Sequence, residues 1–241
     1  MFDNLLKRWR LRLFLKKNSW LIIAITGVLL VVMIGLSVYG ENVGDLLVSV
    51  DSKTVRALSL SENGKFESTD ASSFLTAQGI KSIRDSTYFY VPENITEGDG
   101  LKSDKEENMY FAYSFYLKNV SSVSVGYSAT LKLDRCTKGI DKAIRVMILV
   151  DDEEPKIFAR PKDDGSPESL EEDGNANKRG YTTIPFEGNE IEVVSQSVTE
   201  VNAIQKYTVV IWIEGWDSDC KDNIVGGNFS ASLTFKILES E

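Results

Sequence analysis

The sequence predicts a mainly β protein, a jelly-roll-like antiparallel β-sandwich that follows one N-terminal transmembrane α-helix. Apolar residues beyond Gly40 recur with a period of two in several segments, which is typical of half-buried strands. Turn-forming residues separate these segments at short intervals, as in sandwiches and jelly rolls. Near the N-terminus, Trp20 to Tyr39 form an uncharged and largely apolar run, which predicts the helix.

The N-terminal run predicts a retained membrane anchor. As a helix it is long enough to cross a bilayer core of roughly 30 Å. Six basic residues precede it, against one acidic residue, Asp3; they are Lys7, Arg8, Arg10, Arg12, Lys16 and Lys17. Such an excess of positive charge holds an N-terminus in the cytoplasm. We therefore expect a cytoplasmic stub at 1–17, a signal-anchor helix at 18–40 and an extracytoplasmic domain at 41–241.

A cleaved signal peptide is the alternative to this single-pass cell-membrane topology. The apolar core of a signal peptide usually spans about 7 to 15 residues and ends at a small-x-small site. The run in this sequence is longer, and the stretch Val38–Gly40 is a poor match to such a site. These two features favour the anchor.

The predicted extracytoplasmic domain is acidic. The whole chain has 27 Lys and Arg residues and 36 Asp and Glu residues. The first 17 positions hold six of the basic residues and one of the acidic residues, so 21 basic and 35 acidic residues lie beyond Gly40. The resulting net charge of about −14 opposes binding to nucleic acid and to anionic lipid headgroups. Such a charge keeps an exported protein soluble. A preference for basic or cationic partners is the alternative interpretation.

Five segments predict strong strands, and we expect the first two to form a hairpin. They are Tyr110–Leu117, Val123–Leu133, Ala143–Val150, Lys206–Glu214 and Phe229–Leu238. The third is continuously apolar, which predicts a central strand covered on both faces. Weaker strands are expected at Leu46–Val50, Val55–Leu60, Thr87–Val91, Lys156–Arg160, Tyr181–Pro185 and Glu190–Val194.

Three further segments do not fit the strand pattern. Ser72 to Gln78 is the one modest helical candidate beyond the N-terminal run. Residues 98–108 and 162–179 are charged and poor in apolar side chains, so we expect them to be solvated loops.

The two cysteines, Cys136 and Cys220, predict a disulfide if the domain is exported to an oxidising compartment. Closing a loop between positions 84 residues apart would stabilise the fold by roughly 2–4 kcal/mol in the chain-entropy model. Two reduced, buried thiols are the alternative.

The composition argues against an enzyme. The chain has no histidine, which removes the commonest general base, the Ser–His and Cys–His nucleophile pairs and the histidine-based zinc sites. No phosphate-binding glycine-rich loop of the P-loop or Rossmann type is present. A surface hydrolase that uses carboxylates alone stays open as an alternative, although no spacing selects two of them.

The segment between Trp212 and Gly227 is the most distinctive in the chain. It carries four acidic residues within nine positions, namely Glu214, Asp217, Asp219 and Asp222. Hard oxygen ligands in one loop could hold a weakly bound calcium ion, the one cofactor that the sequence suggests. Lys221 stands where an EF-hand loop would place a ligand, so the loop is not an EF-hand. A solvated turn pinned by the disulfide is the favoured interpretation of the loop.

Aromatic residues near this segment suggest a carbohydrate-stacking surface. They are Trp212, Trp216, Tyr88, Phe89 and Tyr90. The competing interpretation is that alternating aromatics in strands are core residues or cross-strand pairs.

Taken with the apolar N-terminal segment, four motifs resemble the TasA/camelysin group of exported proteins of Gram-positive bacteria. The motifs are Leu58–Glu62, Tyr110–Asn119, Ala143–Met147, and Tyr207–Gly215 with Asp217, Asp219, Cys220 and Gly226–Gly227. The resemblance implies a jelly-roll domain at the cell surface, in a group whose better-known members build matrix fibres by donating a strand to a neighbour. Camelysin is described as a metalloprotease, but a chain without histidine offers no matching zinc site.

We therefore expect a non-enzymatic, membrane-anchored surface or matrix-associated interaction protein. Its partner would be another protein or a second copy, bound through an exposed strand edge. The stretch Leu46 to Leu60 is the predicted donor or acceptor, with an ordinary edge strand in its own domain as the alternative. An accessory or sensing subunit of a larger membrane complex is the other function that stays open.

Overall fold

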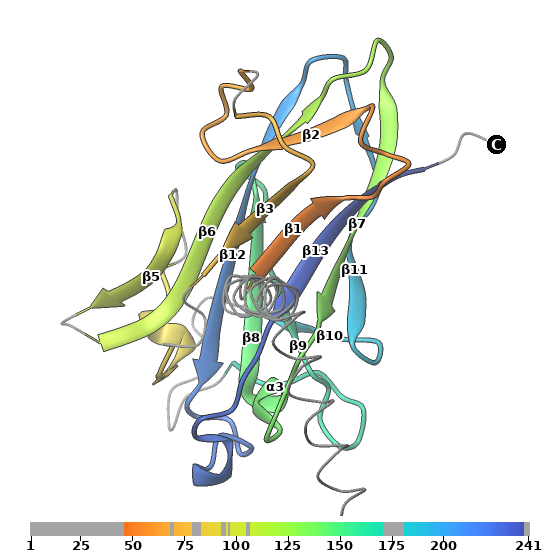
Figure 1. Cartoon of the computed structure of the whole chain (residues 1–241). Helices are drawn as coiled ribbons and strands as arrows, with labels where there is room; N and C mark the ends of the chain where they lie inside the picture. The colour runs from red at the N-terminus through yellow and green to blue at the C-terminus, as the bar shows by residue number, and fades with distance from the viewer. Residues whose placement is uncertain are drawn as a thin grey trace, which may run out of the picture. The chain divides into compact units, whose positions relative to one another are not determined.

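The structure is a computed structural model, and it describes residues 46–67, 70–78, 83–92, 95, 97–104, 107–170 and 181–238. Within these ranges the chain is mainly β, with thirteen strands in two mixed sheets and almost no helix (Figure 1). Gly44–Glu241 form one compact unit. The predicted stub at 1–17 and anchor helix at 18–40 lie outside the described residues. None of the helices in the described part is both long and apolar enough to cross a membrane.

The first sheet has five strands. In order across the sheet they are β11 (Glu190–Thr199), β7 (Val125–Leu133), β13 (Ala231–Ile237), β1 (Leu46–Val50) and β3 (Phe74–Ala77). β1 runs parallel to β13 and antiparallel to β3. The N-terminal strand of the domain is therefore a central strand, held between its last strand and β3 (Figure 1).

The second sheet has eight strands. Its main path is β10 (Thr183–Pro185), β9 (Lys156–Ala159), β8 (Ile144–Val150), β12 (Ile204–Glu214), β6 (Glu107–Asn119) and β2 (Leu58–Ser61), while β4 (Asp85–Ser86) pairs with β12 and β5 (Asp99–Asp104) with β6. β9 and β10 are parallel, as are β4 and β12. The prediction of purely antiparallel sheets is wrong at these pairs and at β1–β13. The two strands of each parallel pair are joined by a long connection, so no hairpin turn constrains them to run antiparallel.

The predicted hairpin between the segments at 110–117 and 123–133 is also wrong. β6 and β7 follow each other in the sequence but belong to different sheets. Asn119 at the end of β6 is fully buried, and its Nδ2 donates to the carbonyls of Val123 (2.8 Å) and Thr199 (3.0 Å). Its Oδ1 accepts from the Ser121 N–H (2.9 Å). This side chain therefore fixes a connection that crosses between the sheets.

One hydrophobic core joins the two sheets. Residues on alternate positions of β1, β7 and β13 share a buried cluster with residues of β2, β6, β8 and β12. Aromatic rings lie at its centre: Phe115 stacks on Tyr207 at 5.5 Å, and Phe235 meets both edge-on. The apolar residues that recur at every second position in the sequence are therefore those on the strand faces that meet in this core.

A second, smaller cluster covers the other face of the eight-stranded sheet. Val210 and Trp212 of β12 and Met147 of β8 pack there against Tyr88 and Leu170. β8 and β12 are consequently buried on both faces, which confirms the prediction of a central strand at 143–150 and explains its unbroken apolar sequence.

Three local expectations were wrong. The helical candidate at 72–78 contains β3, because an aromatic and a β-branched residue pair well with β1 there. The expected strand at 87–91 contains a short 3₁₀ helix, η2 (Tyr88–Tyr90). Part of the expected loop at 98–108 forms β5, which pairs with β6. Two other short helices are α3 (Ile140–Ala143) and η3 (Asp222–Ile224).

Candidate functional site

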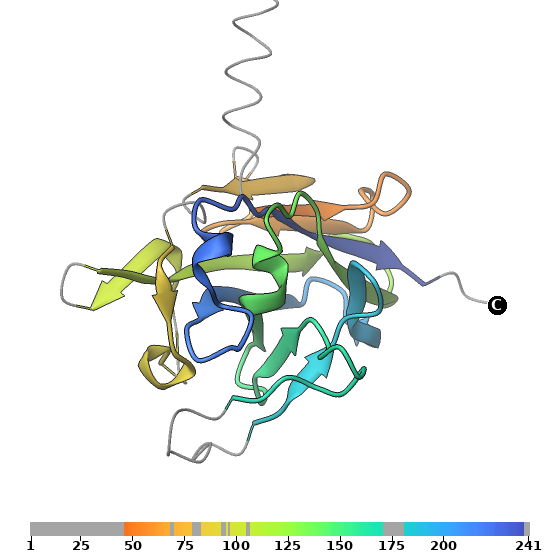
Figure 2. The ribbon, with the colours of Figure 1, turned by 90° about the horizontal axis from the view of Figure 1, so that it is seen from below.

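The end of β12 carries most of the residues that the sequence singles out. β4 pairs with the last two residues of β12, and the Gly215 N–H donates to the Ser86 carbonyl (2.6 Å). The loop that follows contains η3 and lies beside α3 at one end of the sheets, the end that faces the viewer in Figure 2. Segments far apart in the sequence therefore meet around this loop.

An ion pair lies buried beneath the loop. The Arg145 side chain, from β8, is fully buried and its Nη2 donates to Oδ2 of Asp217, which is equally inaccessible. Arg145 Nη1 donates to the carbonyls of Lys142 (3.1 Å) and Ile144 (3.2 Å), and Glu168 Oε2 lies 3.7 Å from Nη2. Burial raises the pKa of the Glu168 carboxyl, and the neighbouring Asp217 charge adds to this rise. Asp217 is thus a structural counter-ion.

Glu214 is buried beside this pair. Its Oε2 accepts from the Trp212 indole Nε1 and from the Tyr88 N–H, both at 3.0 Å. Burial raises the pKa of the Glu214 carboxyl, although the Trp212 hydrogen bond and the Arg145 charge oppose the rise. Glu214 Oε1 has no hydrogen-bond partner among the described residues. The side chain fastens η2 to the end of β12.

The four predicted calcium ligands do not come together. Glu214 and Asp217 are used by the contacts above, and Asp219 faces Lys142 at 3.7 Å. Asp222 lines a pocket that does not include the other three. Within the described ranges, no group of three or more Asp, Glu, Cys or His side chains is arranged to hold a metal ion. Backbone and arginine contacts disperse the acidic residues that cluster in the sequence.

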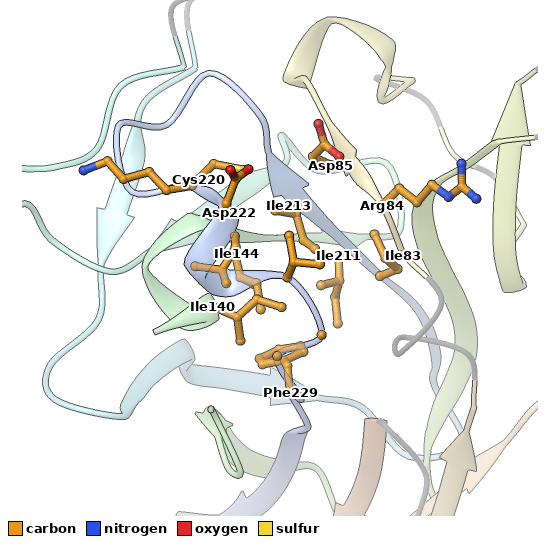
Figure 3. A pocket seen from close by; sticks show the side chains of 15 residues that line it. Ile83, Arg84, Asp85, Ile140, Ile144, Ile211, Ile213, Cys220, Asp222 and Phe229 are labelled. Atoms are coloured by element: carbon orange, nitrogen blue, oxygen red, sulfur yellow. The ribbon is translucent and has the colours of Figure 1, made fainter. Parts of the chain in front are cut away.

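That pocket opens between the loop, α3 and β4, and has a volume of about 330 Å³. Six isoleucines and one phenylalanine line it: Ile83, Ile140, Ile144, Ile211, Ile213, Ile224 and Phe229. Figure 3 shows most of these side chains gathered below the carboxylates of Asp85 and Asp222. The chain therefore has an apolar hollow with charged residues at its rim.

The Gly226–Gly227 pair shapes one wall of this pocket. Gly226 has a φ of +70°, a backbone conformation that glycine adopts without strain. A Cβ on Gly227 would lie 2.9 Å from the Ile224 carbonyl oxygen and 3.0 Å from that of Thr137. The close approach of these backbones explains why the motif has two glycines.

Cys136 and Cys220 are half-buried free thiols in the structure. Burial raises the pKa of Cys136 to about 11, and Asp141 adds to the rise. Burial also raises the pKa of Cys220, where Asp85 is the leading charged contributor. Thus the predicted disulfide is not formed here, and it stays a prediction for the exported protein.

The aromatic residues divide between core and surface. Trp212 and Tyr88 are buried and stack at 6.0 Å, so the core interpretation holds for them. Phe89, Tyr90 and Trp216 are each more than half exposed, and the first two meet edge-on at 5.3 Å. The five therefore do not form one stacking surface.

The sheet edges form a second candidate surface, and one of them differs from the rest. β11 carries Glu190 and Glu192 and two register shifts, and β10 ends in Pro185. The backbone of Leu60 in β2 is bonded to Ser72, which places β2 beside the residues just before β3. β3, with the sequence FLTA, has no charge, proline or register shift. Charges, prolines and bulges are the devices that protect sheet edges from pairing, and β3 lacks them.

The ladder with β1 fixes which backbone groups of β3 point outward. The Val50 N–H donates to the Ser73 carbonyl (2.9 Å), so Phe74 and Thr76 are the residues that direct their N–H and C=O away from β1. The Ser72 hydroxyl contacts both edge groups of Phe74. Those of Thr76 have no backbone partner among the described residues, and the side chains of Phe74 and Thr76 are exposed.

An open hollow of about 340 Å³ lies along this edge. It is lined by Glu62, Asn63, Asp70, Ser72, Phe74, Leu75 and Thr76. A strand added beside β3 would find room there for a side chain. The predicted donor or acceptor at Leu46–Leu60 is not at an edge in β1, so the available edge belongs to the strand next to it.

No family model and no curated protein matches the chain. Among solved structures, it is similar to a β-glucosidase from Kluyveromyces marxianus in complex with glucose, with a TM-score of 0.21 and 9% identity. The similarity covers 76% of this chain and 15% of the enzyme. So low a TM-score carries no argument about fold or activity.

Sequence reasoning missed Arg145, the apolar pocket and the β3 edge. A lone arginine within an apolar strand, Ala143–Val150, was a signal for a buried ion pair, because a buried charge needs a partner. The pocket had no such signal, since its isoleucines come from four separate segments.

Proposed function

We propose that this chain is a non-enzymatic, membrane-anchored surface protein that self-associates through the open edge of β3. The observation that carries the proposal is that β3 ends a sheet without charge, proline or bulge. Backbone groups on such an edge pair readily with another strand. The partner that we propose is β3 of a second copy.

The fold supports a jelly-roll-like sandwich as the frame for this edge. Two sheets that share one core, with few helices among the described residues, are what such a frame requires. The resemblance to the TasA/camelysin group also favours a surface or matrix role, because its better-known members assemble through strands.

Two of the carboxylates that the sequence singles out are poorly placed for catalysis. Glu214 is held by Trp212 and Tyr88, and Asp217 by Arg145, so both carboxylates are engaged in the interior. Neither of them lines the pocket. A general acid or base must reach the proton that it transfers, which these two side chains do not.

The edge suits antiparallel pairing of two copies about a two-fold axis. Antiparallel strands of identical sequence are self-complementary, so one patch serves on both subunits. Phe74, which is 59% exposed, would be covered on pairing. Glu62 and Asp70 border the hollow, and the whole domain is acidic, so the two copies repel each other at low salt. We expect salt to strengthen the association.

Changing Thr76 tests the edge. Thr76→Pro removes an N–H that points away from β1, so it should block an added strand while leaving the β1 ladder intact. Thr76→Val keeps that N–H and is the matched control. Sedimentation velocity of residues 44–241 should show a concentration-dependent dimer for the wild type and for Thr76→Val. For Thr76→Pro the dissociation constant of the dimer should be at least tenfold higher, a loss of about 1.4 kcal/mol of association free energy. Equal dimerisation of all three proteins refutes the role of β3.

The anchor has its own test. Because basic residues precede the apolar run, a protease added to intact cells should digest the region after Gly40 and leave residues 1–17 protected. Digestion that requires opening the cell would contradict the proposed location. A mature N-terminus near Glu41 would show that the anchor is removed.

A further inference from the structure

The pocket beside η3 has the lining of a ligand site. Its volume of about 330 Å³ lies at the lower end of the range for small-molecule sites, about 300–1,000 Å³. Ile140, Ile144, Ile211 and Ile213 present branched aliphatic side chains to it, with Phe229 at the base (Figure 3). A hollow of this kind leaves apolar atoms without packing partners on one side, so an aliphatic group that fills it gains contacts.

Two acidic and two basic residues line the rim: Asp85, Asp222, Arg84 and Lys221. Figure 3 shows the carboxylates of Asp85 and Asp222 on the same side of the isoleucines, while the Arg84 guanidinium points away from them. Neither carboxylate forms an ion pair or a side-chain hydrogen bond with another described residue. Two carboxylates from different segments, β4 and η3, therefore border one apolar hollow, and both are available to a ligand.

We propose that this pocket binds an aliphatic primary ammonium. The hydrocarbon part would lie among the isoleucines, and the ammonium would sit at the rim between Asp85 and Asp222. An ammonium has three donors and suits two separate acceptors such as these carboxylates. The net charge of about −14 beyond Gly40 attracts cations to the whole domain.

The chemistry fits a free alkylamine or the N-terminal ammonium of a polypeptide that begins with an aliphatic residue. The two sources share a protonated primary amine on an aliphatic body. Acetylation of the peptide amine removes the charge and keeps the body, so it separates recognition of the ammonium from simple apolar binding. This site is distinct from the β3 edge, and its failure leaves the proposed function untouched.

Titration of the full chain in nanodiscs of zwitterionic lipid tests the proposal, with empty nanodiscs as the blank. Hexylammonium should bind, and hexanoate should not. Affinity should rise roughly fourfold per methylene from butyl- to hexylammonium, because each methylene leaves water. Hexanol has the same hydrocarbon chain without the charge. If hexanol binds as tightly as hexylammonium, the carboxylates do not recognise the ammonium and the proposal is overturned.

Variants locate the ammonium. Asp85→Asn and Asp222→Asn should each weaken hexylammonium binding roughly fivefold, the effect of losing one partly exposed charge pair. Asp219→Asn is the matched control, since it belongs to the same loop but does not line the pocket, and it should bind as wild type does. If all three variants bind alike, the proposal is wrong.

The same titration identifies the source. The peptide Ile-Gly-Gly should compete with hexylammonium, and its N-acetylated form should not. Binding of the peptide alone supports a polypeptide N-terminus, and binding of the alkylamine alone supports a small amine. If neither ligand binds wild type with a preference over its uncharged counterpart, the proposal is overturned.

Discussion

Replacing Asp217 with asparagine is expected to lower the free energy of unfolding by about 3–5 kcal/mol, because it leaves the Arg145 charge buried without its counter-ion. Both side chains are inaccessible to solvent, so water does not screen the loss. Glu168, at 3.7 Å from Nη2, replaces only part of the interaction. Urea unfolding of residues 44–241 measures the change.

Two further variants sharpen this prediction. Asp219→Asn, in the same loop, should change stability by no more than about 0.5 kcal/mol, because Asp219 and its partner Lys142 are both partly exposed to solvent. Arg145→Met combined with Asp217→Leu should cost less than Asp217→Asn alone, since no charge is left buried. A loss of less than about 1 kcal/mol for Asp217→Asn would show that the ion pair is not buried as described.

Deleting residues 41–50 is expected to unfold the domain. The deletion removes β1, whose Leu46 and Val48 are fully buried in the shared core, and it leaves β13 and β3 without the strand between them. Each lost aliphatic core side chain costs about 2–5 kcal/mol on truncation, which approaches the whole stability of a typical domain, about 5–15 kcal/mol. Circular dichroism should show loss of the strand signal and of the cooperative melting transition.

The matched deletion ends before β1. Removal of residues 41–45 alone should leave the melting transition in place. A domain that stays folded without residues 41–50, yet loses self-association, would mean that copies exchange β1, and that the β3 edge is not the contact.

The sequence predicted the strands well where the core imposes a period. Alternate residues of Tyr110–Leu117 face one core, and the unbroken apolar run Ala143–Val150 matches a strand covered on both faces. Strand partners were harder, because they depend on contacts between distant segments. Hydrogen bonds from the Asn119 side chain hold the connection through which the chain crosses to β7 in the other sheet. In the sequence, a short polar stretch such as Asn119–Ser122 suits a hairpin equally well.

The candidate sites show a similar limit. Four acidic residues within nine positions predicted one calcium site, but a loop directs successive side chains in different directions. Arg145, 72 residues away, forms an ion pair with Asp217. The Trp212 indole and the Tyr88 backbone N–H donate hydrogen bonds to Glu214. The pocket and the β3 edge combine segments whose proximity only the fold determines.

Hydrogen exchange at β3 tests the central claim most directly. The Thr76 amide points to the open edge, so in dilute solution it should exchange rapidly, while those of Leu75 and Ala77, bonded to β1, should be protected. When the concentration of residues 44–241 is raised, the account predicts new protection at Thr76. Exchange at Thr76 that is independent of concentration, or new protection only at another strand, would contradict association through β3.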